Sequence, residues 1–141
     1  MLRRSVTMNE ESTGTMRKEI QNWWRQAEKD LEKAEWLSAG EHFDGTALYC
    51  QQAVEKALKA LILRTTREKK IEGHSLVHLG KMAKVPARFL PGLRKLSPQY
   101  FVSRYPDVTE EAPYELFDEA LAKEYLGLAA EVLKWIKQQL A

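Results

Sequence analysis

Hydrophobic residues recur every three or four positions in three long stretches of the chain, the spacing of an amphipathic helix. The first stretch begins at Met16 and is followed by Gly40, a residue type common just after a helix ends. The second follows Asp44, which we expect to cap its N-terminus, and the third runs from Leu116 almost to the C-terminus. The pattern therefore predicts three long helices.

The region between the second and third of these helices is polar and interrupted by proline. Ser75 is placed to cap a short helix that carries Leu76, Leu79 and Met82. Prolines farther along leave room for at most one more short helix, around residues 89–96. Because no stretch alternates in the manner of a strand, we expect an all-α fold: an antiparallel up-and-down bundle of three long helices plus one or two short helices.

The chain of 141 residues is long enough for one domain with a core of its own. Residues 1–15 lack apolar periodicity, so we expect a mobile N-terminal arm there and a single helical domain over residues 16–141. The single Cys50 excludes an intramolecular disulfide and indicates a reducing compartment, so we expect a cytoplasmic protein. No apolar run reaches the roughly 20 residues that span a bilayer, and we expect no membrane association.

Charge is unevenly distributed, although the formal net charge is only +2. Nine basic residues stand against two acidic ones between Arg64 and Lys95, whereas seven acidic residues stand against one basic residue between Asp107 and Glu124. The basic stretch suits a surface that binds phosphates. Alternatively, the two segments neutralise each other across the fold or across a dimer.

Polar residues accompany the apolar stripe of the second long helix. Gln52, Glu55, Lys56 and Lys59 are three or four positions apart and are predicted to share a face, with Gln51 beside them. One interpretation is a polar groove in which a lysine meets phosphate and a glutamine reads a base. The other is pairing on the helix surface, Glu55 with Lys59 and Gln52 with Lys56.

Two histidines lie one helical turn apart at the start of the short helix, His74 and His78. They have the spacing of a zinc pair, but no nearby Cys, Asp or Glu supplies a third ligand, so we expect neither metal nor cofactor. His74 is expected to hydrogen-bond the backbone at the helix start. General acid or base chemistry is the alternative for His74.

The sequence Arg104-Tyr105-Pro106-Asp107 precedes the last long helix. Pro106 favours an extended Tyr105, which presents the ring and the Arg104 guanidinium at a surface. A ring beside a planar, bidentate donor suits a nucleotide, whose base stacks and whose phosphate accepts hydrogen bonds. Alternatively, Arg104 and Asp107 form an ion pair that holds the loop to the bundle.

Several of these segments, in this order, resemble the HEPN family, the nucleotide-binding domain of higher eukaryotes and prokaryotes. The segment from Ala47 to Leu61 resembles its second-helix signature, and Arg104-Tyr105-Pro106-Asp107 resembles the tract before its last helix. Further similarity lies at the start of the predicted short helix and in the first long helix. These further residues are Gly73, His74, Ser75 and Leu76, and Ala27, Asp30, Leu31 and Ala34.

The resemblance implies a helical bundle that commonly dimerises and is often encoded beside a minimal nucleotidyltransferase, as a toxin-antitoxin pair. Some members are metal-independent ribonucleases that use an Arg and a His a few residues apart near the start of the last long helix. Arg104 stands in the place of that Arg, but Thr109, Glu110 and Glu111 occupy the places for the His.

We therefore expect a homodimeric nucleotide-binding and interaction module that has a nucleotidyltransferase as a possible protein partner. The expected nucleotide site comprises Gln52, Glu55, Lys56, Lys59, Arg104, Tyr105 and Asp107. The alternative is a metal-independent ribonuclease with a degenerate motif, for which Arg104 and His74 are the catalytic candidates.

Overall fold

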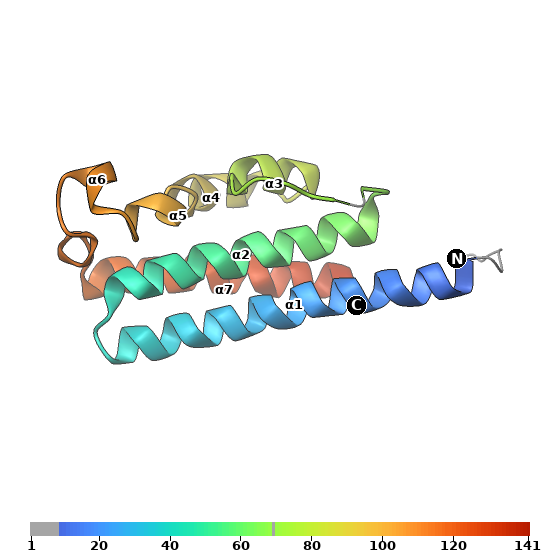
Figure 1. Cartoon of the computed structure of the whole chain (residues 1–141), viewed down its shortest axis with the longest axis horizontal. Coiled ribbons are helices and arrows are strands. Elements are labelled where there is room, and N and C mark those ends of the chain that lie inside the picture. The colour runs from blue at the N-terminus through green and yellow to red at the C-terminus, as the bar shows by residue number, and fades with distance from the viewer. Residues whose placement is uncertain (1–8, 69) are drawn as a thin grey trace.

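Three long helices form the body of the molecule. The structure is a computed structural model that describes residues 9–68 and 70–141. Helix α1 (Asn9–Ala39) and helix α2 (Phe43–Thr65) run antiparallel, joined by a tight turn. Helix α7 (Glu119–Leu140) lies against both of them and runs in the same direction as α2, because the segment between α2 and α7 returns along the bundle (Figure 1). The predicted all-α bundle is confirmed.

The returning segment contains more short helices than the sequence predicts. It runs along α2 on the side opposite to α1 (Figure 1). Its elements are α3 (Leu76–Met82), η1 (Ala87–Phe89), α4 (Leu90–Leu96), α5 (Gln99–Val102), α6 (Pro106–Thr109) and η2 (Pro113–Leu116). Prolines begin several of these helices, since proline is favourable in the first turn, where its missing N–H has no intrahelical partner. Prolines that were expected only to interrupt helices therefore also start them.

The helix ends differ from the expected ones in two places. Helix α1 begins at Asn9, so residues 9–15 of the predicted arm belong to this helix, while residues 1–8 lie outside the described part of the chain. Asp44 is not the cap of α2: it lies in the first turn, where a carboxylate is favourable to the helix dipole. The predicted cap of α3 is present, because the Ser75 side chain accepts a hydrogen bond from the His78 amide.

Helix α2 lies at the centre of the hydrophobic core. Its side chains Leu58, Leu61 and Ile62 are almost completely buried against the other elements. Small residues line its contact with α1, among them Ala27 and Ala34 of α1, which are fully buried. Small side chains let helix backbones approach closely, which explains why the two longest helices share the most extensive contact in the molecule.

An ion pair within the body of the bundle links α1 to α2. Asp30 on α1 is 1% exposed and accepts hydrogen bonds from Lys56 of α2 and from Gln26 of its own helix. Lys95 on α4 and Glu124 on α7 pair at 2.8 Å and link the basic and acidic segments. No helix in residues 9–68 and 70–141 is both long and apolar enough to cross a membrane.

We predict that Asp30→Ala lowers the free energy of unfolding by about 3 kcal/mol, because it leaves the Lys56 ammonium, whose side chain is 22% exposed, without a counter-charge. Glu32→Ala is the matched control on the same helix, since the Lys29–Glu32 pair is exposed and should contribute less than about 0.5 kcal/mol. Urea unfolding at one fixed protein concentration measures both. Equal effects of the two substitutions would contradict a structural role for the Asp30 pair.

Candidate functional site

Three polar side chains on one stripe of α2 are buried beneath the loop that precedes α3. Gln51, Glu55 and Lys59 follow one another at intervals of four residues and are 0%, 5% and 7% exposed. The Gln51 amide donates to Glu55 Oε1 at 3.0 Å, and the Lys59 ammonium donates to Glu55 Oε2 at 2.9 Å. Burial without hydrogen bonds would cost each of these groups several kcal/mol, so the three form one connected network around the Glu55 carboxylate.

His74 completes this network from the loop before α3. Its Nδ1 lies 3.0 and 3.2 Å from the two carboxylate oxygens of Glu55, and its backbone carbonyl accepts from Gln51 at 3.4 Å. The sequence analysis predicted that His74 hydrogen-bonds the backbone at the helix start. The His74 ring instead hydrogen-bonds the Glu55 side-chain carboxylate. Because Nδ1 is engaged and the side chain is 45% exposed, Nε2 is the ring nitrogen available to a ligand.

The pKa of Glu55 lies below its ordinary value. Burial is the strongest influence and raises this pKa, because it disfavours the charged carboxylate. Hydrogen bonds from Gln51 and Lys59, the charge of Lys59 and the hydrogen bond with His74 together outweigh burial. The carboxylate thus stays ionised and fixes the position of the imidazole.

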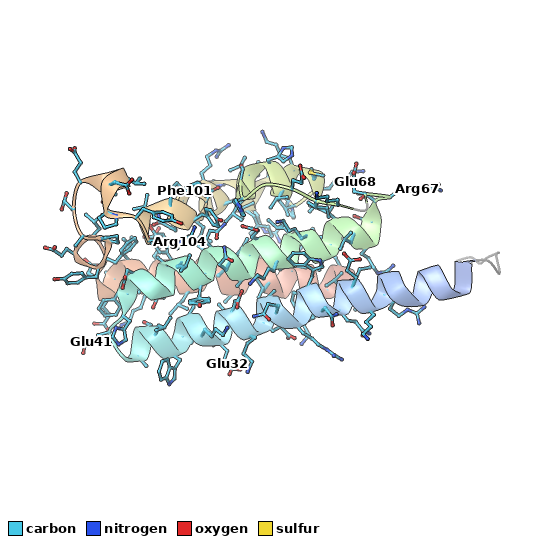
Figure 2. The ribbon with its side chains drawn as sticks, viewed as in Figure 1. Glu32, Glu41, Arg67, Glu68, Phe101 and Arg104 are labelled. Carbon is cyan, nitrogen blue, oxygen red and sulfur yellow. The ribbon has the colours of Figure 1, made fainter. Side chains whose placement is uncertain are left out.

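Aromatic rings and a guanidinium extend from His74 across the surface. The rings of His74 and Tyr100 stack with their centroids 3.8 Å apart and an interplanar angle of 13°. The Arg104 guanidinium carbon lies 4.3 Å from the Tyr100 ring centre and 4.8 Å from that of Tyr105. Figure 2 shows Arg104 on the returning segment, near Phe101. We call His74, Tyr100, Arg104 and Tyr105 the aromatic–arginine ladder.

Arg104 is held by its Nε atom, which donates to the Tyr100 carbonyl at 2.8 Å. Its terminal amino groups make no hydrogen bond with another described residue, and the side chain is exposed. The predicted alternative, an Arg104–Asp107 ion pair, is not formed among the described residues. Asp107 is exposed in the first turn of α6. The ladder therefore presents donors of Arg104 to solvent.

The remaining candidates of α2 do not join Glu55 on one face. Lys56 points to α1 and pairs with Asp30, and Gln52 donates to the Gln51 side chain at 2.7 Å. Of the two surface pairs proposed from the sequence, Glu55 with Lys59 is formed and Gln52 with Lys56 is not. The four residues separate because each helical step turns the side chain by about 100°, so positions 52 and 56 follow a stripe different from that of 55 and 59.

The sequence analysis placed Gln51 beside the predicted polar face but outside the expected nucleotide site, and it assigned no role to Tyr100. Gln51 carries a readable signal, because its spacing to Glu55 and Lys59 is that of one helical stripe. Tyr100 carries none: it lies in a short helix behind Pro98, where no periodicity shows which side chains face α2. Its position depends on the fold, which brings the loop of His74 beside α5.

Exposed apolar side chains are frequent in the stretch of chain that contains Arg104 and Tyr105. Five large hydrophobic side chains are exposed among the described residues, and four of them lie in the segment from Phe101 to Tyr114. These four are Phe101, Tyr105, Val108 and Tyr114, at 51%, 42%, 51% and 68% exposure. The ring centroids of Phe101 and Tyr105 lie 6.4 Å apart, and exposed apolar side chains of this size often mark a contact surface. We call these four residues the apolar patch.

The protein is a helical bundle whose central helix carries a buried polar network. The family model "HEPN domain" matches residues 20–139, most of the chain. The chain therefore belongs to the HEPN family, as its sequence motifs predicted. Among curated proteins, none gives a significant match.

Two solved structures resemble the protein over nearly their full lengths. ST0689, an archaeal HEPN homologue, is 39% identical, with a TM-score of 0.74 and coverage of 86% of this chain and 98% of that chain. TT1696 from Thermus thermophilus is 27% identical, with a TM-score of 0.76 and coverage of 84% of this chain and 96% of that chain. Both share the bundle described above.

We predict that Glu55→Gln destabilises the protein by about 2 kcal/mol at pH 7, since it removes the charge that binds Lys59 and His74. Because the folded pKa is lowered, the carboxylate contributes its stability above the ordinary value of 4.5 and loses it as the pH falls through the folded pKa. The difference between parent and variant should therefore shrink in acid.

Urea unfolding at pH 7 and at pH values below 4.5 measures this difference. Glu119→Gln is the matched control, because its pair with Lys123 is 68% and 71% exposed. A Glu55→Gln penalty that stays constant down to the acid limit would show that the network does not depend on the ionised carboxylate.

Proposed function

We propose that this HEPN-family protein is a nucleotide-binding and interaction module, and that the aromatic–arginine ladder is its nucleotide site. The observation that carries the proposal is the exposed Arg104 guanidinium between two tyrosine rings. A guanidinium with free amino groups binds phosphate oxygens in a bidentate manner, and an exposed ring provides a stacking surface for a base.

The buried network beneath the ladder supports this proposal. His74 and Tyr100 are held in place by stacking and by the Glu55 carboxylate, so the ladder needs little rearrangement to receive a ligand. Lys59 is excluded from direct phosphate contact because it is 7% exposed and already bound to Glu55. Within the proposal, the α2 residues position the ligand-binding groups, and Arg104 and Tyr105 meet the nucleotide.

We also propose that the protein acts as a cytoplasmic homodimer and that a minimal nucleotidyltransferase is its partner in a toxin-antitoxin-type pair. The resemblance to the HEPN family suggests both associations, and the apolar patch supports a contact surface. Its Tyr105 also belongs to the ladder, so a protein that covers the patch would adjoin the nucleotide site. A nucleotidyltransferase gene beside this one would favour the pairing.

Isothermal titration with ATP, ADP and GTP tests the nucleotide site. We expect one of them to bind, and Arg104→Ala to weaken that binding at least about tenfold through loss of the phosphate contact. Arg88→Ala is the matched control, because its guanidinium also lies over an aromatic ring, 4.6 Å from the centre of Phe89, but outside the ladder. Absence of heat with all three nucleotides, or equal weakening by both substitutions, would remove the nucleotide proposal.

A metal-independent ribonuclease is the second candidate, and the His74–Glu55 pair favours it. Glu55 fixes the His74 ring and leaves Nε2 to take up or release a proton, while Arg104, on the same Tyr100 ring, is placed to stabilise charge on a phosphate. The missing His after Arg104 would then be replaced by His74 from the loop before α3.

RNA incubated with the protein in excess chelator tests this candidate. Cleavage should fall about a hundredfold or more in His74→Ala and in Arg104→Ala, in line with the loss of a proton-transfer group or of charge stabilisation. His78→Ala is the matched control, since His78 is exposed on α3 outside the ladder. Cleavage at the parental rate in the first two variants would assign the activity to a contaminant.

A further inference from the structure

A hollow of about 610 Å³ lies at the end of the bundle where α1, α2 and α7 meet, away from the ladder. Its apolar lining comes from Ile20, Trp24, Leu63 and Leu140. Three cationic side chains also line it, one from each helix: Arg17, Arg64 and Lys137. Ala141 also lines the hollow with its main-chain carboxylate, which forms no ion pair with the three cations, and none of the lining side chains carries a carboxylate. The volume lies within the range of about 300–1,000 Å³ that is usual for small-molecule sites.

The three cations have no ion-pair partner among the described residues. Arg64 and Lys137 lie in the last turns of α2 and α7, where a cation is favourable to the helix dipole. The helix dipole accounts for the positions of Arg64 and Lys137, but their side-chain N–H groups donate to no other described residue. It does not explain the position of Arg17. Three like charges around one apolar hollow repel one another, so a bound anion would be favourable.

We propose that the hollow binds an amphipathic carboxylate, an aliphatic chain with a single anionic head such as a fatty acid. Leucine and isoleucine side chains favour an aliphatic body, since Gln21 is the one uncharged polar side chain in the lining. The three cations favour a carboxylate head. This site goes beyond the proposed nucleotide function, with which it shares no residue.

Charge on the adjoining surface sets the orientation of the ligand. A second hollow between α1 and α7 shares Trp24 and Lys137 with the first and has Leu31 and Leu133 in its lining. Its α1 rim carries Glu28, Glu32 and Glu35, which outnumber the two cations of its α7 rim, Lys134 and Lys137. Because these carboxylates repel an anion, the head binds at the Arg17 end and the aliphatic chain extends past Trp24.

Titration with laurate tests the proposal. We expect saturable binding that changes the indole fluorescence of the parent but not of Trp24→Phe. Arg17→Glu combined with Lys137→Glu should weaken binding at least tenfold, because both side chains are exposed and their reversal repels the carboxylate. Lys18→Glu combined with Arg25→Glu is the matched control: both residues are exposed on α1 and neither lines the hollow.

Dodecyltrimethylammonium, which has the same chain length with a cationic head, should bind at least tenfold more weakly than laurate. Circular dichroism verifies that each charge-reversed variant is folded. Equal binding of the two amphiphiles, equal loss in the control variant, or no laurate binding would overturn the proposal. Light scattering that shows a dimer of the parent and a monomer of Arg17→Glu/Lys137→Glu would also overturn it, because the hollow would then be a subunit contact.

Discussion

The need to satisfy one buried carboxylate organises the polar side of this bundle. Glu55 lies on the central helix, is 5% exposed, and would be unfavourable there without hydrogen bonds. Gln51 and Lys59 supply two partners from the same helix, and His74 supplies a third from a loop that is distant in sequence. The loop is thereby fixed on α2, and the stacking of Tyr100 on His74 depends on it. The positions of His74 and Tyr100 in the ladder therefore depend on the buried Glu55 carboxylate.

The two polar stripes of α2 have different tasks because they face different neighbours. The stripe of Gln51, Glu55 and Lys59 faces the His74 loop and leads to the surface through a half-exposed imidazole. The stripe that carries Lys56 faces α1, where the partner Asp30 is almost fully buried. The stripe with Glu55 leaves the His74 Nε2 atom available to a ligand. The stripe with Lys56 leaves no comparable exposed group, and its contribution is the alignment of α1 with α2.

The returning segment carries Arg104 and Tyr105 of the proposed nucleotide site and the exposed apolar residues near them. Its short helices are separated by prolines and turns, and they carry most of the exposed large hydrophobic side chains among the described residues. Arg104 is anchored in this segment by a hydrogen bond to the Tyr100 carbonyl and lies over the Tyr105 ring, and Figure 2 shows it near Phe101. A sequence of short elements exposes more side chains than one continuous helix would, because each turn changes which face meets the bundle. This explains why Arg104, Tyr105 and most of the exposed apolar side chains lie on the irregular part of the fold.

The amino-acid sequence by itself determined the three long helices, since their apolar periodicity reflects which side chains are removed from water, and it determined the family through motifs spread along the chain. It also specified local features such as the Ser75 cap, which involves residues three positions apart. The tertiary structure alone decided that His74 binds Glu55, that Lys56 turns to Asp30, and that Tyr100 joins His74 to Arg104. Helical spacing fixes neighbours within one helix. It carries no information on which stripe faces which distant segment, because that choice depends on how whole helices pack and on which buried charges must find partners.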